Sequence, residues 1–226
     1  MLQLNGGTFP TGGFSQSWGL ETYVAEGIVK DVTSFQEFLE VYLMSSIGKC
    51  EGPIIRRAYE LMNLMRAADA EDAASQLKEL EQRSNAVKVT KESREAGLRM
   101  GRAFGRIMEP VLGEETVLPL REVFGGMNIS YPVLYGCVCS ILEIDIAKAL
   151  EAYVFSTANT LTQSALKLIP LGNVEAQQVL FEMDGYMENV SRVSMSTDID
   201  YVTNFCPGID IASLRHEALP VRLYMS

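Results

Sequence analysis

The chain has 226 residues, of which 47% are hydrophobic and 21% are charged, and its formal net charge at pH 7 is -10. This composition is typical of a globular protein that builds a stable core without disulfides or a structural metal. Because an acidic chain repels phosphate backbones and anionic lipid surfaces, we expect neither nucleic acid nor a membrane among its partners.

The cysteines and the apolar stretches predict a cytoplasmic protein. Residues 1–13 contain no basic segment followed by a long apolar run, so no secretory signal peptide is predicted. No stretch approaches the roughly 20 apolar residues of a membrane span. The four cysteines, in a chain without secretion signals, are expected to stay reduced.

Helical patterns follow an irregular N-terminal segment. Residues 6–13 are rich in Gly, Thr and Pro, and we expect no regular structure there. Thr33 or Ser34 can cap a first helix, whose apolar residues recur at intervals of three and four. Pro53 suits the first turn of a second helix, and Asp69 can cap a third helix that runs to about residue 84.

The segment from residue 90 to residue 108 predicts an amphipathic helix, with apolar residues on one side and basic residues on the other. Gly97, Gly101 and Gly105 recur every four residues between these two faces. Each glycine costs a helix roughly 0.5–1 kcal/mol relative to alanine, so this stripe indicates that another backbone packs closely against it. A groove for a partner is the alternative. Pro110 and Gly113 are expected to end this helix.

Three more helices are predicted in the second half of the chain. Pro132 is expected to open an apolar helix that runs to residue 142, and further helices are expected over residues 144–168 and 173–193. Strand signals are scarce, and we find no internal repeat and no low-complexity linker. We therefore predict an all-α fold, a single-domain multi-helix bundle with an irregular N-terminal segment and a C-terminal tail.

The segment from Tyr201 onward is broken by Pro207, Gly208 and Pro220, yet it is rich in apolar residues. A disordered tail would contain fewer of them, so we expect either the domain itself or a partner to cover this segment. Composition alone leaves both alternatives open.

The sequence offers little catalytic chemistry. His216 is the only histidine, and it lies in the proline-bounded tail, a weak platform for preorganised catalysis. Cys137 and Cys139 lack the Cys-x-x-Cys spacing of zinc sites, and no Walker-type phosphate-binding loop occurs. We expect a binding protein that is not an enzyme, with no catalytic residue, no cofactor and no metal site. Two alternatives stay open: a helical adaptor unrelated to metals, and a small hydrolase that uses Cys139 or Cys206 with His216.

Four short motifs, in order along the chain, resemble those of a known family. Residues 10–21, PTGGFSQSWGLE, are similar to a Pro-x-Gly-x-Phe-x-x-Ser-x-Gly-Leu-Glu signature. Residues 90–94, TKESR, are similar to a Lys-Glu-x-Arg motif at the start of a central helix. Residues 166–173, LKLIPLGN, resemble a Val-Arg-Leu-x-Pro-Leu-Gly-Gln element, with Lys167 in place of Arg. Residues 207–226 resemble a closing pattern that contains Ser-x-x-His-Glu and Arg-Leu-Phe, with Tyr224 in place of Phe.

With this combination of motifs the chain resembles the urease accessory protein F (UreF) family. The resemblance implies an all-α scaffold that binds two other accessory proteins. One is the UreD/UreH-type protein, in a complex that is usually a dimer of heterodimers, so a homodimer of this chain is implied within the complex. The other is the P-loop GTPase UreG, which brings nickel. The assembly then delivers nickel to apo-urease.

The resemblance also suggests what covers the apolar tail. We hypothesise that residues 207–226 are loosely held in the isolated chain and become ordered on the UreD/UreH-type partner. The prediction is thus a helical domain over residues 1–206, with residues 207–226 as the partner-binding tail of the same domain.

The same resemblance indicates which residues contact partners. They are charged residues of the second motif, the lysine of the third motif, and polar and apolar residues of the tail. The predicted partner-binding residues are Lys91, Glu92, Arg94, Lys167, Asp210, His216, Glu217, Arg222, Leu223 and Tyr224.

Overall fold

Helices make up the regular structure of the chain, which we describe from a computed structural model covering residues 4–5, 11–13, 16–67, 70–219 and 222–224. These residues contain no strand, which confirms the predicted all-α fold. Most of residues 6–13 and the predicted cap Asp69 lie outside the described residues. The α-helices are α1 (Leu20–Ala25), α2 (Val32–Tyr42), α3 (Gly52–Ala67), α4 (Ala70–Ala86), α5 (Lys91–Leu112), α6 (Glu114–Phe124), α7 (Tyr131–Ile141), α8 (Ile146–Leu168), α9 (Asn173–Glu182), α10 (Asp184–Ser196) and α11 (Pro207–His216).

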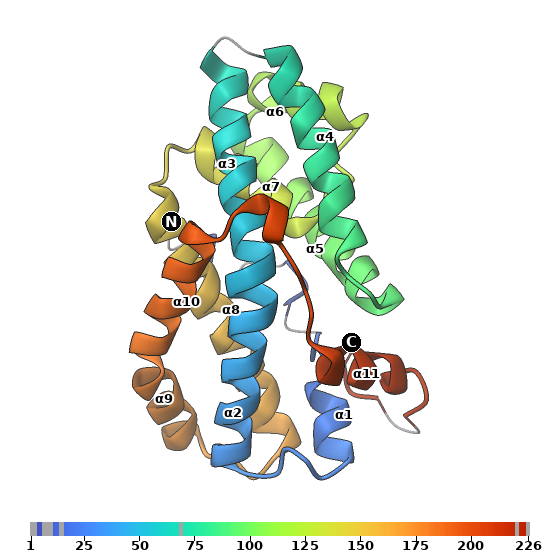
Figure 1. Cartoon of the computed structure of the whole chain (residues 1–226), viewed down its shortest axis with the longest axis vertical. Helices are drawn as coiled ribbons and strands as arrows, with labels where there is room; N and C mark the ends of the chain where they lie inside the picture. Colours follow the sequence, from blue (N-terminus) through green and yellow to red (C-terminus); the bar gives the residue numbers. More distant parts are fainter. Residues whose placement is uncertain (1–3, 6–10, 14–15, 68–69, 220–221, 225–226) are drawn as a thin grey trace.

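A long helical column runs through the molecule from α2 to α3, joined by the π-helical segment η2 (Leu43–Glu51) (Figure 1). The column begins at Asp31, whose carboxylate accepts the backbone N–H of Ser34 at 2.9 Å. The prediction that Thr33 or Ser34 caps this helix was therefore wrong. Ser34 instead completes a capping box, because its hydroxyl accepts the backbone N–H of Asp31 at 3.2 Å.

Pro53 lies in the first turn of α3, as predicted, because α3 begins at Gly52. The element before it was not predicted to be continuous with it: the π-helical segment η2 ends at Glu51, so α3 follows without a loop. Proline has no N–H, so the carbonyl oxygen of Lys49, four residues earlier, receives no bond from it. The backbone N–H of Thr203, far away in the sequence, donates to that oxygen at 3.2 Å.

The centre of the fold is α7, in which every residue from Tyr131 to Ser140 is buried. A Cβ atom at Gly136 would clash with the carbonyl oxygen of Ile55, so α7 and α3 approach backbone to backbone. A Cβ atom at Gly101 would likewise overlap the carbonyl oxygen of Ile129, just before α7. The packing interpretation of the glycine stripe is therefore confirmed at Gly101.

The other predicted helices are confirmed with two changes. The helix from residue 90 extends through Pro110 and ends at Leu112, and the helix predicted over 173–193 is split into α9 and α10 at Met183. The helices α1, α6 and α11 were not predicted. None of the described helices combines the length and the apolarity that crossing a lipid bilayer requires.

Candidate functional site

The candidate site lies where α11 packs against α1 and the first turn of α5 (Figure 1). The buried residues of α11 are Ile209, Ala212, Ser213 and His216, at the spacing of one helical face. This inner face seats the segment on the body of the protein. We expected the isolated tail to be loosely held; in the structure its described part is packed.

The start of α1 is shaped to receive this inner face. Gly19 has φ +85°, a left-handed conformation that glycine adopts without strain, and α1 begins at the next residue. A Cβ atom at Gly19 would lie 3.4 Å from the Cβ atom of Ala212 and from the carbonyl oxygen of Ile209. The hydroxyl of Thr22 donates to the carbonyl oxygen of Ala212 at 2.9 Å.

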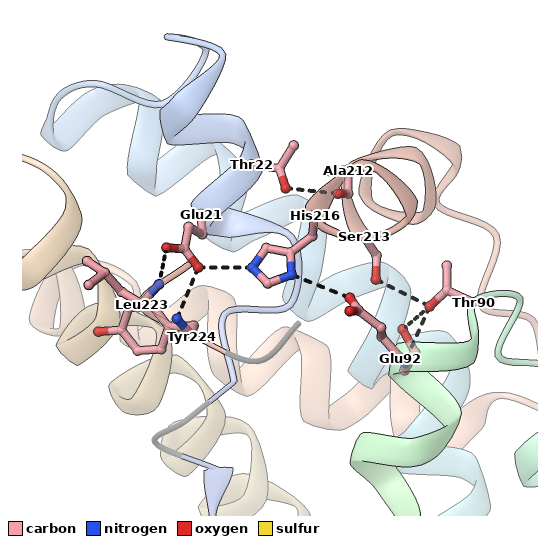
Figure 2. A network of polar contacts seen from close by, with 10 residues as sticks. Glu21, Thr22, Thr90, Glu92, Ala212, Ser213, His216, Leu223 and Tyr224 are labelled. Atoms are coloured by element: carbon pink, nitrogen blue, oxygen red, sulfur yellow. Dashed lines mark hydrogen bonds and ion pairs between the residues drawn. The ribbon is translucent and has the colours of Figure 1, made fainter. Parts of the chain in front are cut away.

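Glu21 binds the C-terminal segment at three points (Figure 2). Its Oε1 accepts the backbone N–H of Leu223 at 2.7 Å, and its Oε2 accepts that of Tyr224 at 3.1 Å. Oε2 also lies 3.0 Å from Nε2 of His216. Since Glu21 is only 6% exposed, these two backbone donors and the imidazole ring take the place of water around its carboxyl group.

The first turn of α5 forms the second wall of the site. Thr90 caps this helix by accepting the backbone N–H of Ser93 at 3.2 Å, and its hydroxyl lies 3.3 Å from that of Ser213. Oε2 of Glu92 lies 3.5 Å from Nδ1 of His216. Burial raises the pKa of Glu92, although the neighbouring His216 and Arg222 oppose this shift. His216, which is 1% exposed, thus lies between two carboxylates (Figure 2).

Three of the predicted partner-binding residues meet at this buried centre or beside it. They are Glu92, His216 and Tyr224, which is 7% exposed. Lys167, at the end of α8, places its ammonium 5.8 Å from the centroid of the Tyr224 ring, an arrangement typical of a cation–π contact. The structure therefore places these residues at the contact between the C-terminal segment and α1, α5 and α8, which we call the seat; His216 and Tyr224 are buried there, Glu92 is partly buried and Lys167 is exposed.

The remaining predicted residues lie around this centre. Lys91 points to solvent and pairs with Glu95 at 3.7 Å. The guanidinium of Arg94 donates to the carbonyl oxygens of residues 88 and 89, so it holds the chain before α5. Asp210 is half-buried, and burial raises its pKa. Exposed positions are occupied by Glu217, Arg222 and Leu223.

The sequence analysis missed Glu21, Thr22, Thr90 and Ser213 as site residues. Glu21 matched the N-terminal signature and Ser213 matched the closing pattern, but a match to a motif does not predict that the two motifs contact each other. The signal available was that Glu21 and His216 both lie in motifs of the same family. Pro10 and Phe14 of the signature, and Ser226 of the closing pattern, lie outside the described residues.

A polar cavity of about 80 Å³ adjoins the seat and is lined by Trp18, Glu51, Lys88, Tyr153 and Asp210, among others. Lys88 and Glu51 form a buried ion pair at 2.7 Å, and the hydroxyl of Tyr153 donates to the second oxygen of Glu51 at 2.8 Å. A polar space of this size holds a few water molecules. Within the described residues, no three His, Cys, Asp or Glu side chains come together as a metal site would require.

The geometry does not favour the hydrolase alternative. Cys139 is fully buried, and burial raises the pKa of its thiol to about 12, so the nucleophilic thiolate is suppressed. Both ring nitrogens of His216 face carboxylates. A base for a cysteine nucleophile would have to face the thiol.

Comparisons with known proteins agree with the resemblance in the sequence. The model of the UreF family matches residues 29–184. The chain is 31% identical to the urease accessory protein UreF of Bacillus sp. (strain TB-90), over all of this chain and 97% of that protein. The chain belongs to the UreF family. It is also 30% identical to the UreF of Corynebacterium glutamicum (strain R), over all of this chain and 96% of the relative. With the UreF of Sporosarcina pasteurii the identity is 28%, over 92% of this chain and all of the relative.

The matched range covers only part of the candidate site. The family match ends before α11 and begins after α1, so both helices of the seat lie outside it, whereas Glu92 and Lys167 lie within it. The chain is accordingly a urease accessory protein in which α1 and the C-terminal segment contact each other directly, beside the first turn of α5.

Proposed function

We propose that this chain binds the UreD/UreH-type accessory protein through its C-terminal segment. On this proposal the complex recruits the GTPase UreG and delivers nickel to apo-urease in the cytoplasm. The chain acts in it as a scaffold without catalysis of its own, and as a homodimer within the complex. Membership of the UreF family supports this role, and so does the absence of a Walker-type phosphate-binding loop from the sequence.

The observation that carries the proposal is the outward surface of the C-terminal segment. While the inner face of α11 is buried, Ile211 and Leu214 on its other side are 48% and 57% exposed. Phe205 before the helix and Leu223 after it are 78% and 67% exposed. We call these four residues the outer apolar set. Large exposed apolar side chains gathered on one segment are typical of a surface that a partner covers.

This arrangement changes the role proposed for the tail. Its inner face and His216 attach the segment to its own chain, and the outer apolar set contacts the partner. A preorganised segment loses less conformational entropy on binding than a disordered one, so a packed tail favours a tighter complex. Residues 207–226 would then be the partner-binding part of the same domain.

The test replaces apolar side chains on the outer side of α11. We expect Ile211→Asp combined with Leu214→Asp to weaken binding of the UreD/UreH-type protein at least about tenfold, since buried interface anchors each contribute more than about 1 kcal/mol. Co-expression followed by size exclusion measures it. Both side chains point away from the seat, so the variant is expected to fold, which a deletion of residues 207–226 would put at risk.

The matched control is Val111→Asp combined with Leu118→Asp. These side chains are 60% and 47% exposed on α5 and α6, away from α11. It should bind like the wild type. Equal complex formation by the Ile211/Leu214 variant and the wild type would contradict the proposed interface.

A further inference from the structure

His216 makes contacts that a neutral imidazole cannot satisfy. Its Nε2 lies 3.0 Å from Oε2 of Glu21, and its Nδ1 lies 3.5 Å from Oε2 of Glu92. A neutral ring carries one N–H, so it can donate to one carboxylate while its other nitrogen presents a lone pair to the second. With the ring only 1% exposed, two facing acceptors are costly because little water can separate them.

One additional proton resolves this conflict. Either the ring becomes an imidazolium that donates to both carboxylates, or the carboxyl group of Glu92 keeps its proton and donates it to Nδ1. In both cases the proton lies between α11 and α5. The same α11 is attached to α1 through Glu21, which also binds the backbone of Leu223 and Tyr224.

We propose that the packing of the C-terminal segment onto α1 and α5 is coupled to one proton shared by His216 and Glu92. The segment is held firmly at mildly acidic pH and loosens as the pH rises. We call Glu21, Glu92 and His216 the proton clasp. The clasp itself is a property of the isolated chain; its importance for binding a partner rests on the function proposed above.

The charged groups around the clasp favour retention of this proton. Burial raises the pKa of Glu92, and the carboxylate of Glu217 raises it further, against the opposing effect of His216 and Arg222. The other charged groups on the packed elements are engaged with partners of their own. They are Arg215 with Glu26, Lys91 with Glu95, Lys88 with Glu51, Arg94 with backbone carbonyls, and Lys167 with the ring of Tyr224. Asp210, half-buried on α11, has a raised pKa as well.

The sign of the pH dependence follows from the one additional proton that the packed segment binds. The packed segment holds this proton to a higher pH than the released segment does, so packing is fully favoured at low pH and weakens as the pH rises. Between the pH at which the released segment loses the proton and the higher pH at which the packed segment loses it, each pH unit favours release by up to about tenfold.

Hydrogen exchange of the full-length chain tests the proposal. We expect protection of the amides of Leu223, Tyr224 and α11, corrected for the intrinsic exchange rate, to fall by up to about tenfold per pH unit within about pH 5.5–8.5. Protection that does not change with pH would overturn the proposal without recourse to any variant.

Glu92→Gln provides a second, directional test. The side-chain amide of glutamine donates an N–H to a neutral Nδ1, so this variant needs no additional proton and its protection should be independent of pH. The control Glu95→Gln, on the same helix and 52% exposed, should keep the wild-type dependence. A Glu92→Gln chain that keeps the full wild-type pH dependence would refute the shared proton.

Complex formation at the two ends of this pH range separates the two proposals. If the segment responds to pH as expected but no complex with the UreD/UreH-type protein forms at any pH, the clasp stands and the proposed function falls. If a complex forms while the protection of the isolated chain is flat, the function stands and the clasp falls.

Discussion

At the scale of single residues, Glu21 shows how a buried carboxylate can attach one end of a chain to the other. Its oxygens receive the backbone N–H groups of Leu223 and Tyr224 and face the ring of His216. Hydrogen bonds to a charged acceptor contribute about 1.5–3 kcal/mol each, more than bonds between neutral groups. The position of the last described residues therefore depends on the charge of this side chain.

The substitution Glu21→Gln should release these last residues. The glutamine side chain keeps one acceptor oxygen but turns an NH₂ group toward a donor, so at least one bond is lost. We expect the amides of Leu223 and Tyr224 to exchange roughly 10–100-fold faster, as the loss of about 1.5–3 kcal/mol implies. Glu26→Gln is the control, because Glu26 forms an exposed pair with Arg215 and such pairs contribute at most about 1 kcal/mol. An unchanged rate in the Glu21→Gln variant would mean that the carboxylate does not hold the segment.

At the scale of elements, the glycine stripe of α5 is a packing feature. The backbone before α7 lies so close to Gly101 that no side chain fits between them. Gly185 in α10 is different, since a Cβ atom there would have no neighbour within 4 Å. The two glycines therefore make a matched pair in which the same change should have opposite effects.

We expect Gly101→Ala to lower the free energy of unfolding by about 1–3 kcal/mol, because the added methyl group forces the backbone of Ile129 away. Gly185→Ala should raise it by about 0.5–1 kcal/mol, because alanine loses less backbone entropy than glycine in a helix. Urea denaturation followed by circular dichroism measures both. Similar effects of the two substitutions would show that the close contact at Gly101 is not limiting.

Helices with a clear apolar period were predictable from the sequence, and those at α7 and α8 were placed almost to the residue. The errors concern where helices begin and which stretches between the periodic segments are helical. The first long helix is capped by Asp31 and not by Thr33 or Ser34, and α3 follows the π-helical segment η2 without a loop. Pro207 was expected to break the tail, but it is the first residue of α11. Proline is tolerated there because the N–H groups of a helix's first turn have no partner within the helix.

The sequence indicated which segments belong to the candidate site, but not how their side chains are oriented. The motifs pointed to the tail and to the first turn of α5, but a motif does not say whether a side chain points inward or outward. His216 and Tyr224 were predicted to contact partners, and the structure buries them against α1 and Glu21. The side chains of Ile211 and Leu214 match no motif, and only the structure of α11 shows that they point outward.

At the scale of the whole molecule, the core contains an unusual number of phenol groups around one ion pair. Tyr131, Tyr135 and Tyr153 lie with ring centroids 5.1–5.9 Å apart, and Tyr153 donates to Glu51 of the Lys88 pair. Burial raises the pKa of each of these tyrosines. Burial alone would lower the pKa of Lys88, but the charge and the hydrogen bond of Glu51 raise it above its usual value.

These shifts all act in one direction, so alkaline pH should destabilise the folded chain. Each group holds its proton more tightly in the folded state, and unfolding releases that proton once the pH exceeds the ordinary pKa of about 10. The buried thiols of Cys50, Cys137 and Cys139 act in the same direction from their lower ordinary pKa of about 8.5, because burial raises the pKa of each of them. The free energy of unfolding should therefore begin to fall above about pH 8.5 and fall more steeply above about pH 10, by up to about 1.4 kcal/mol per pH unit for each group. Urea denaturation at several pH values measures this slope.

Tyr42 allows the slope to be traced to a single phenol. It is 5% exposed, and burial raises its pKa well above the ordinary value. Tyr42→Phe removes one proton that unfolding would release, so its stability should fall less steeply above about pH 10 than that of the wild type. Tyr201→Phe, at a side chain that is 77% exposed, is the matched control and should keep the wild-type slope. If both variants lose stability as steeply as the wild type, the alkaline transition must come from the remaining core tyrosines, the buried cysteines and Lys88 and not from Tyr42.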